Sequence, residues 1–85
     1  MSYHLYILQS EKDGSFYVGT TNNLDNRIKR NNEGRAKYTK AKRPWELVYV
    51  EEHLDRSSAM KREYAIKRRK STDYITKLVD EFSSA

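Results

Sequence analysis

Four residues of this chain have the side-chain types needed to hydrolyse a phosphodiester bond with the help of one metal ion. Tyr6 and Tyr17 are phenols eleven residues apart, Arg27 follows ten residues later, and Glu63 stands far downstream among basic residues. A phenol can orient a water molecule, a guanidinium can neutralise a phosphate, and a carboxylate can hold a divalent cation. Each of these side chains also has an ordinary structural interpretation, so their positions in the fold decide between the two.

Glu63 is the carboxylate with the least ordinary setting. It shares one face of a predicted helix with Ala59, Met60 and Ile66, so we expect its side chain on the core side of that helix. A carboxylate there is costly unless it is paired or bound to a metal. Two interpretations stay open: a ligand of a divalent metal ion, or an i,i+4 ion-pair partner of Lys67.

Arg27 and the two tyrosines are equally open to two readings. Arg27 borders an apolar stripe and either reaches back over the sheet or lies along the surface with its charge in water. Tyr6 and Tyr17 serve well as ordinary core aromatics. As a general base, tyrosine starts from a pKa near 10, and bringing it to 7 takes about 4 kcal/mol of preferential stabilisation of the phenolate. A metal ion and Arg27 together could supply that stabilisation.

Length and composition limit the class of protein. We expect residues 1–85 to form one domain, because a chain of 85 residues has no room for a second core. Cysteine is absent, which excludes disulfides and Cys-based zinc sites. The sequence has neither a charged-then-apolar leader nor a long apolar run, so we expect a soluble cytoplasmic protein with no membrane partner.

The charge distribution predicts a polyanionic partner. The net charge is +5, and lysine and arginine cluster in segments 27–43 and 61–70. Clustered positive charge favours nucleic acid through counterion release. We expect the DNA backbone to contact the basic loop 35–43 and Arg62, Lys67, Arg68, Arg69 and Lys70, with Tyr38 or Trp45 placed to stack on an unpaired base. The predicted nucleic-acid-binding residues are Arg35, Lys37, Tyr38, Lys40, Lys42, Arg43 and Lys67.

The elements that position these residues begin with a β-hairpin. Residues 3–8 read as a strand covered on both faces, and residues 16–20 as its partner across turn-forming residues. Two registers are open. A two-residue turn at Asp13-Gly14 sets Tyr6 opposite Thr21, and a four-residue loop over 10–13 sets Tyr6 opposite Tyr17. Only the second of these two places the phenols directly opposite each other.

The rest of the chain predicts one more strand and helices. A helix over 24–33 follows the capping residues Thr21-Asn22-Asn23, a surface loop spans 35–44, and a third strand runs over 45–53. A helix capped by Asp55 or Ser57 continues to 69, and a last helix spans 72–82 with Ile75, Leu78, Val79 and Phe82 facing inward. The fold class is α+β in the order ββαβαα, with helices flanking a three-stranded, mainly antiparallel sheet.

The order and spacing of these segments resemble the GIY-YIG nuclease domain, and its small stand-alone bacterial members above all. The resemblance covers about residues 3–70. It rests on segments that are weak singly but specific in this order, namely Leu5-Tyr6-Ile7, Tyr17-Val18-Gly19, Thr21-Asn22-Asn23-Leu24 leading to Arg27, Ala36-Lys37-Tyr38-Thr39, Arg43-Pro44, Leu47-Val48-Tyr49 and Ala59-Met60-Lys61-Arg62-Glu63.

The resemblance implies a role for each candidate residue. Tyr6 would hydrogen-bond near the attacking water, and Tyr17 would act as the general base or as a water-orienting phenol. Arg27 would hold the scissile phosphate, and Glu63 would be the sole protein ligand of a Mg²⁺ or Mn²⁺ ion. Gly19 would permit a close backbone approach. The implied substrate is DNA, whether branched, damaged or single-stranded; the sequence does not indicate an oligomeric state.

One position of the candidate catalytic set departs from the family pattern. Asn31 stands four residues after Arg27, where the family usually has a histidine or tyrosine; its amide can orient water but cannot accept a proton at neutral pH. Thr20 also replaces a lysine that some members carry. A metal-dependent endonuclease is therefore the leading hypothesis. A nucleic-acid-binding module with a weakened site and a small basic protein with a protein partner remain as alternatives.

Overall fold

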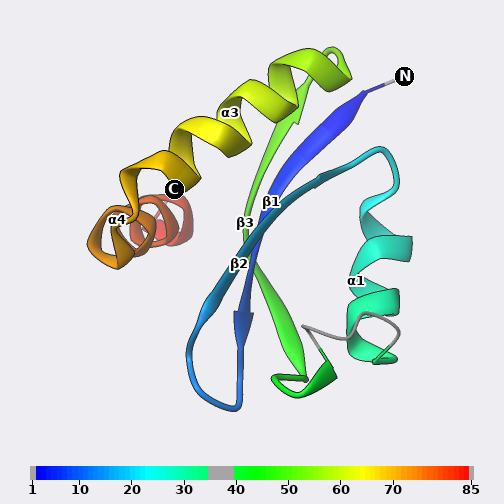
Figure 1. The fold of residues 1–85 in the computed structure, drawn as a ribbon, viewed down its shortest axis with the longest axis vertical. Helices are drawn as coiled ribbons and strands as arrows, with labels where there is room; N and C mark the ends of the chain where they lie inside the picture. Colours follow the sequence, from blue (N-terminus) through cyan, green and yellow to red (C-terminus); the bar gives the residue numbers. More distant parts are fainter. Residues whose placement is uncertain (1, 35–39, 85) are drawn as a thin grey trace.

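A three-stranded antiparallel sheet forms the centre of the structure, a computed structural model that describes residues 2–34 and 40–84 (Figure 1). Its strands are β1 (Tyr3–Ser10), β2 (Phe16–Thr21) and β3 (Trp45–His53), in the order β2-β1-β3. Both pairings are antiparallel. β1 is therefore the central strand, and β2 is an edge strand.

The central position of β1 explains its composition. Side chains on alternate residues of a strand point to opposite faces, so a strand covered on both sides must be apolar throughout. Leu5, Tyr6, Ile7 and Leu8 are all fully buried, which confirms the predicted strand covered on both faces.

The β1–β2 hairpin has a register that neither of the two predicted ones describes. Tyr6 pairs with Gly19, whereas the predictions paired it with Thr21 or with Tyr17. Both predictions were wrong by two residues. Because strand side chains repeat with a period of two, an error of two residues leaves every side chain on the same face. Tyr6 and Tyr17 consequently share a face as diagonal neighbours rather than as a directly opposed pair.

The turn chemistry explains this register. The Ser10 backbone N–H donates to the Ser15 carbonyl at 2.8 Å, which leaves a four-residue loop between them. The Ser10 hydroxyl oxygen accepts hydrogen bonds from the N–H groups of Lys12 at 3.1 Å and Asp13 at 3.3 Å. Gly14 has a φ of 77°, the left-handed region that glycine adopts without strain. Asp13-Gly14 therefore ends a longer loop and does not form a two-residue turn.

Helices cover both faces of the sheet. α1 (Leu24–Asn32) lies on one face, while α3 (Arg56–Arg69) and α4 (Thr72–Ser84) lie on the other (Figure 1). The α1 cap is Asn23, whose side chain accepts from the Asn26 N–H at 3.1 Å. The α3 cap is Asp55, the first of the two predicted candidates, whose side chain accepts from the Ser58 N–H at 2.8 Å. The described elements follow the predicted order ββαβαα, and the α+β fold class is confirmed.

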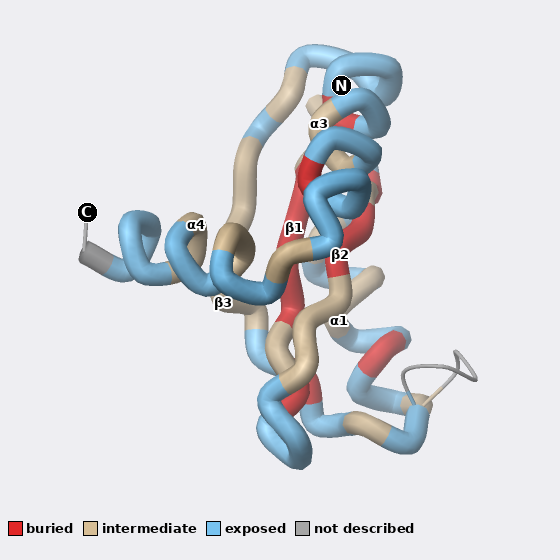
Figure 2. The backbone as a smooth tube through the Cα atoms, turned by 60° about the vertical axis from the view of Figure 1, so that its left-hand side comes forward, coloured by how far each residue is buried: buried red, intermediate tan, exposed pale blue. Residues whose placement is uncertain are grey.

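The sheet divides the core into two clusters. On the α3 and α4 side the buried residues are Leu5, Ile7, Val18 and Ile66; on the α1 side they are Tyr6, Leu8 and Trp45. Leu24 and Ile28 of α1 pack against the second cluster. Figure 2 shows the buried backbone concentrated in β1 and its neighbours, with the helices largely exposed on their outer sides.

Two apolar residues lie closer to water than predicted. Met60 was expected on the buried stripe of α3, but it is 48% exposed. The helix buries Ala59 and Ile66 instead, and this rotates Met60 toward the edge of the sheet. In α4, Ile75 and Leu78 pack on the core, whereas Phe82 is 45% exposed and meets only the edge of the Tyr49 ring, at 5.3 Å between centroids.

The predicted surface loop over 35–44 is described in part. Residues 35–39 lie outside the described residues; of 40–44, all but half-buried Lys42 are exposed. Among the helices that the structure describes, none has the length and apolarity required to cross a membrane.

Candidate active site

The ring of Tyr6 lies directly over the backbone of Gly19. A Cβ atom at Gly19 would come within 2.6 Å of the Tyr6 hydroxyl oxygen and 2.8 Å of its Cζ. Real Cβ atoms do not approach heavy atoms this closely, and the hydroxyl sits at the end of a stiff, fully buried ring. Glycine at this position thus lets the phenol reach across the edge strand.

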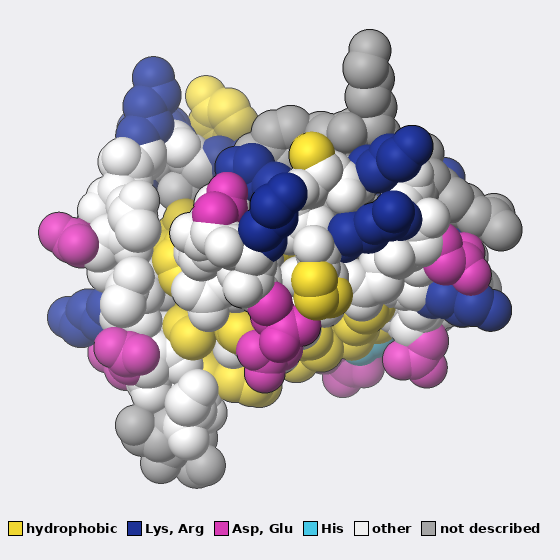
Figure 3. Space-filling view, turned by 90° about the horizontal axis from the view of Figure 1, so that it is seen from below, with side chains coloured by type: hydrophobic (Ala, Val, Ile, Leu, Met, Phe, Trp, Pro, Cys, Tyr) yellow, Lys and Arg dark blue, Asp and Glu magenta, His cyan; other side chains and the backbone are white. Residues whose placement is uncertain are grey.

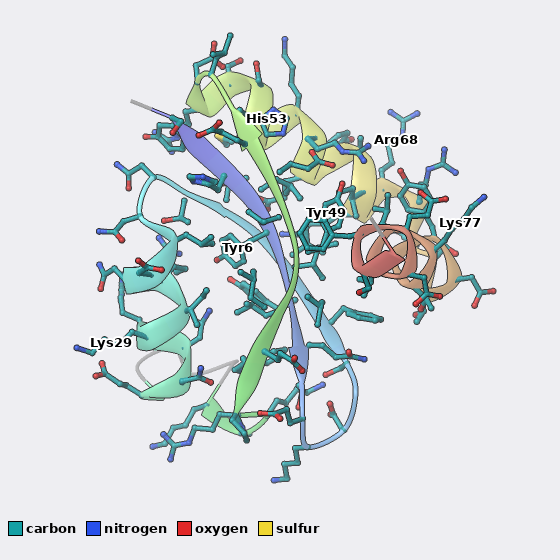
Figure 4. The ribbon with its side chains drawn as sticks, turned by 180° about the vertical axis from the view of Figure 1, so that it is seen from behind. Tyr6, Lys29, Tyr49, His53, Arg68 and Lys77 are labelled. Carbon is teal, nitrogen blue, oxygen red and sulfur yellow. The ribbon has the colours of Figure 1, made fainter. Side chains whose placement is uncertain are left out.

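Tyr17 lies beside Tyr6 on the same face of the sheet. The two ring centroids are 6.4 Å apart with an interplanar angle of 33°, and Tyr17 also meets the Trp45 ring at 6.1 Å. Figure 4 shows Tyr6 projecting from β1 toward α1, whereas Tyr49 projects from the sheet toward α4. The two candidate phenols thus belong to the α1 face.

The charges of the other three predicted residues act on the Tyr6 hydroxyl. Burial raises the pKa of Tyr6 to about 12, and the neighbouring Tyr17 and the Glu63 carboxylate add to the rise. The charge of Arg27 acts in the opposite direction, as does its side-chain hydrogen bond to the Tyr6 oxygen. This contact falls short of regular hydrogen-bond geometry, so the buried hydroxyl is poorly satisfied. A poorly satisfied buried hydroxyl costs about 1–3 kcal/mol.

Arg27 and Asn31 come from successive turns of α1. The Arg27 N–H donates to the Asn23 carbonyl at 3.1 Å and so begins the helix, and the Arg27 side chain is half-buried. This orientation matches the predicted reach over the sheet rather than a fully solvated arginine. Asn31 is 3% exposed and is the buried residue of α1, so its amide lies on the inner side of the helix.

Glu63 satisfies parts of both predicted interpretations. Lys67 Nζ lies 2.6 Å from Glu63 Oε2, the i,i+4 ion pair expected of a structural glutamate. The carboxylate is nevertheless only 24% exposed, and its charge acts on the buried Tyr6 hydroxyl. Within the described part of the chain, Lys67 contacts Oε2 alone, which leaves Oε1 for another ligand.

The donor set fits a single hydrated metal ion rather than a protein cage. Among the described residues no three His, Asp or Glu side chains group closely enough to enclose a cation. Mg²⁺ suits such a site, because it usually keeps several waters and binds through one or two carboxylates plus substrate phosphates. The free Oε1 of Glu63 is the oxygen available for that contact.

The predicted nucleic-acid contacts divide into three groups. Arg35, Lys37 and Tyr38 lie outside the described residues. Lys40 and Arg43 are exposed, whereas Lys42 Nζ pairs with Asp13 at 3.3 Å and Lys67 pairs with Glu63. Figure 3 looks at the end of the molecule that carries the β1–β2 turn, and it shows Lys and Arg side chains gathered over the upper half of this face.

Sequence reasoning missed two contributors to this part of the molecule. Asn32, at the end of α1, accepts from the Trp45 N–H at 2.6 Å and donates to the Trp45 carbonyl at 3.1 Å, which ties the helix to the start of β3. Arg56, the first residue of α3, lines a small cleft together with Arg27. No local pattern marks either contact, because both join segments far apart in the sequence.

The fold and the convergence of two phenols, a guanidinium and a carboxylate define a small α+β nuclease-like domain. The chain belongs to the GIY-YIG family: the model of the GIY-YIG catalytic domain matches residues 2–77. The predicted resemblance is confirmed, and the match continues beyond residue 70 into α4.

Similar proteins from several bacteria support this assignment. A UPF0213 protein of Bacillus cereus is 41% identical over 78 residues, covering 87% of this chain and 81% of its own. The UPF0213 protein YazA of Bacillus subtilis is 42% identical over 76 residues, covering 85% and 77%. The solution NMR structure of a UPF0213 protein from Bacillus halodurans is similar with a TM-score of 0.53 and 38% identity, covering 89% of this chain and 84% of that one.

Proposed function

We propose that this protein is a metal-dependent endonuclease that hydrolyses phosphodiester bonds in DNA. The observation that carries the proposal is the poorly satisfied, fully buried Tyr6 hydroxyl, on which the charges of Tyr17, Arg27 and Glu63 all act. These groups come from β1, β2, α1 and α3, and a chance packing arrangement gives no reason for all of them to act on one polar atom.

Tyr6 acts as a hydrogen-bond donor in this proposal. Its raised pKa keeps the phenol protonated at neutral pH, so it holds the attacking water by donating to the water oxygen. Tyr17, beside it on the same face, accepts a hydrogen bond from that water and takes its proton as the water oxygen bonds to phosphorus and the bond from phosphorus to the leaving oxygen breaks. The two phenols therefore have different roles, set by their different burial.

Arg27 and Glu63 stabilise charge in the transition state. The Arg27 guanidinium holds the scissile phosphate and neutralises the charge that develops on its oxygens. Glu63 would hold a Mg²⁺ or Mn²⁺ ion through Oε1 while Lys67 keeps Oε2 in place. Such an ion supplies Lewis-acid polarisation of the phosphate and stabilises the leaving oxygen.

The test is a nicking assay on plasmid, single-stranded and branched DNA with Mg²⁺, Mn²⁺ or EDTA. We expect metal-dependent cleavage by the native chain, lost by at least 100-fold in Glu63→Ala and Arg27→Ala, an order of magnitude typical of single charge-stabilising groups. Matched controls are Arg30→Ala, exposed on the same helix, and Glu81→Ala, exposed on α4. DNA that stays intact in every metal while being bound would overturn the endonuclease proposal.

A DNA-binding module with a weakened site is the second candidate. Asn31 favours it, because an amide cannot take the proton that a histidine at this position would accept. The Lys67–Glu63 ion pair also favours it, since it occupies one carboxylate oxygen. The variant Asn31→His separates the candidates: faster cleavage identifies an active site limited by this residue, and binding without cleavage in both forms identifies the module.

A further inference from the structure

A cleft of about 240 Å³ lies at the end of β2, next to the candidate active site. Arg27 of α1 and Arg56 of α3 both line it. Thr20, Thr21 and Asn22 form its wall. The two arginines come from different helices on opposite faces of the sheet, so only the folded chain brings them to one recess.

The cleft is electropositive and has no acidic side chain in its lining. Within the residues described, neither Arg27 nor Arg56 forms an ion pair with a carboxylate, although Glu51, Glu63 and Asp13 each pair with a cation elsewhere. Two guanidinium groups lining one recess repel each other unless anionic groups lie beside them. A phosphate suits the fork of a guanidinium, and adjacent phosphates of one strand can supply one anion to each arginine.

The wall of the cleft is held in place before any ligand binds. The Thr21 hydroxyl accepts from the Asn23 N–H at 3.0 Å and donates to the Asn23 carbonyl at 3.2 Å, and the Asn23 side chain in turn caps α1. Thr21 is 6% exposed, so these bonds are shielded from water. A preformed wall lowers the ordering cost of binding.

The edge of the cleft is apolar on the α3 side. Met60 lines it and is 48% exposed, which contradicts its predicted place in the core. Tyr3 lines the same recess from β1. A polar centre with an apolar rim suits a phosphate that carries a sugar, rather than an isolated inorganic ion.

We propose that this cleft binds a phosphate of the nucleic-acid strand adjacent to the scissile phosphate, with Arg56 as its guanidinium ligand. The inference rests on the proposed function in one respect, because it takes Arg27 to hold the scissile phosphate. Arg56 is then a binding residue that fixes the strand, and the reacting atoms remain with the four candidate catalytic side chains. Adjacent phosphates on one strand are thereby engaged by α1 and α3 respectively.

The test measures DNA binding by fluorescence anisotropy in EDTA at several salt concentrations, where no cleavage is needed. Removing one phosphate contact should lower the slope of log affinity against log salt by about 0.7–0.9. We expect this loss for Arg56→Ala and a nearly native slope for Arg56→Lys, which keeps the charge. The control is Lys61→Ala, exposed on the same helix but outside the lining of this cleft.

An unchanged slope in Arg56→Ala, an equal loss in Lys61→Ala, or failure of the native chain to bind DNA would each overturn the proposal. DNA that is bound but never cut would overturn the endonuclease proposal alone, because the slope still measures the Arg56 contact. Where cleavage is observed, Arg56→Ala should raise KM several-fold with kcat unchanged, since it removes uniform binding. A fall in kcat at constant KM would contradict the binding role.

Discussion

At the scale of single residues, Gly19 determines where the candidate catalytic phenol of Tyr6 can lie. β2 would ordinarily present a Cβ at this position, but the Tyr6 ring occupies that space. The hydroxyl thus lies across the edge strand, within reach of charges from α1 and α3. The glycine is required by contact here and not by backbone conformation, because its φ is not in the left-handed region.

The first prediction concerns this contact. Gly19→Ala should displace the Tyr6 ring and reduce cleavage to the level of Tyr6→Phe, while the sheet still forms. Overpacking of this kind costs typically about 1–3 kcal/mol of stability. Circular dichroism and urea unfolding check the fold, and the nicking assay checks the activity. Full activity in Gly19→Ala would show that the position of the Tyr6 hydroxyl does not matter to the reaction.

The second prediction follows from the raised pKa of Tyr6. The unfolded phenol loses its proton near pH 10, whereas the folded one keeps it until about pH 12. The unfolded state therefore binds fewer protons across this window, and the free energy of unfolding should fall as pH rises from 10 to 12. The drop amounts to about 2–3 kcal/mol. Urea unfolding of the native chain and of Tyr6→Phe between pH 9 and 12 measures this drop. If the free energies of unfolding of the two proteins change in parallel with pH, the burial of the phenol is contradicted.

At the scale of elements, a polar network anchors α3 to the sheet on the face opposite the two candidate phenols. The Glu51 carboxylate of β3 accepts from Arg62 Nε at 3.0 and 3.2 Å and from the Tyr49 hydroxyl, and it contacts His53 Nε2 at 3.0 Å. Figure 4 shows Tyr49 and His53 on this side of the sheet. Arg62 also reaches the Tyr74 hydroxyl of α4 at 3.4 Å. The network thus fixes the helix that carries Glu63 and Arg56.

The third prediction tests this anchor through pH. Burial alone would raise the pKa of Glu51, but the hydrogen bonds from Tyr49, His53 and Arg62 outweigh it and lower the pKa below its ordinary 4.5. Its contribution to stability is therefore present above about pH 4.5 and is lost as pH falls through the lower folded value. Glu51→Gln should be less stable than the native chain by about 1–3 kcal/mol at pH 7. The free energies of unfolding of the two proteins should converge as pH falls below 4.5, and a constant difference would contradict the role of the charge.

The sequence predicted elements better than it predicted their contacts. Strand and helix positions follow from local propensity and periodicity, and they were correct to within a few residues. The hairpin register depended on Ser10, whose hydroxyl organises a four-residue loop that resembles a two-residue turn in composition. Met60 was placed on the buried stripe because it lies three residues before Glu63, but α3 buries Ala59 and Ile66 and leaves Met60 48% exposed. Asn32 carries no periodic signal for its two bonds to Trp45.

The candidate site was predictable as a set of residues and not as a geometry. Tyr6, Tyr17, Arg27 and Glu63 were identified from their order, and the charges of the last three act on the Tyr6 hydroxyl. Their catalytic roles stay a prediction. The Lys67 ion pair was expected only as an alternative to a metal ligand, yet Glu63 forms it while keeping one oxygen available. The two interpretations of Glu63, metal ligand and ion-pair partner, do not exclude each other, because a carboxylate has two oxygens and can bind both partners.

At the scale of the whole molecule, the sheet separates two tasks. One face carries the ion network and α4, and the other carries the phenols and α1, with β1 buried between them (Figure 2). The cleft at the end of β2 is lined from both faces, by Arg27 of α1 and Arg56 of α3. A nucleic-acid strand that contacts both arginines, as we propose, would therefore span both faces around the β2 edge.

The fourth prediction concerns how the net charge of +5 is used across that surface. Lys40 and Lys42 are two residues apart, but Lys40 is exposed with no carboxylate partner among the described residues, whereas Lys42 is paired with Asp13 at 3.3 Å. A lysine that is already paired releases fewer counterions on meeting a phosphate, because it must first lose its carboxylate. Lys40→Ala should therefore lower the slope of log DNA affinity against log salt by about 0.7–0.9, and Lys42→Ala by clearly less.

The variant Asp13→Asn removes the carboxylate partner of Lys42 and should raise the affinity for DNA. Equal slopes for the two lysine variants would mean that DNA binding depends on total charge alone, and that the ion pairs on this surface do not select which lysines meet the strand.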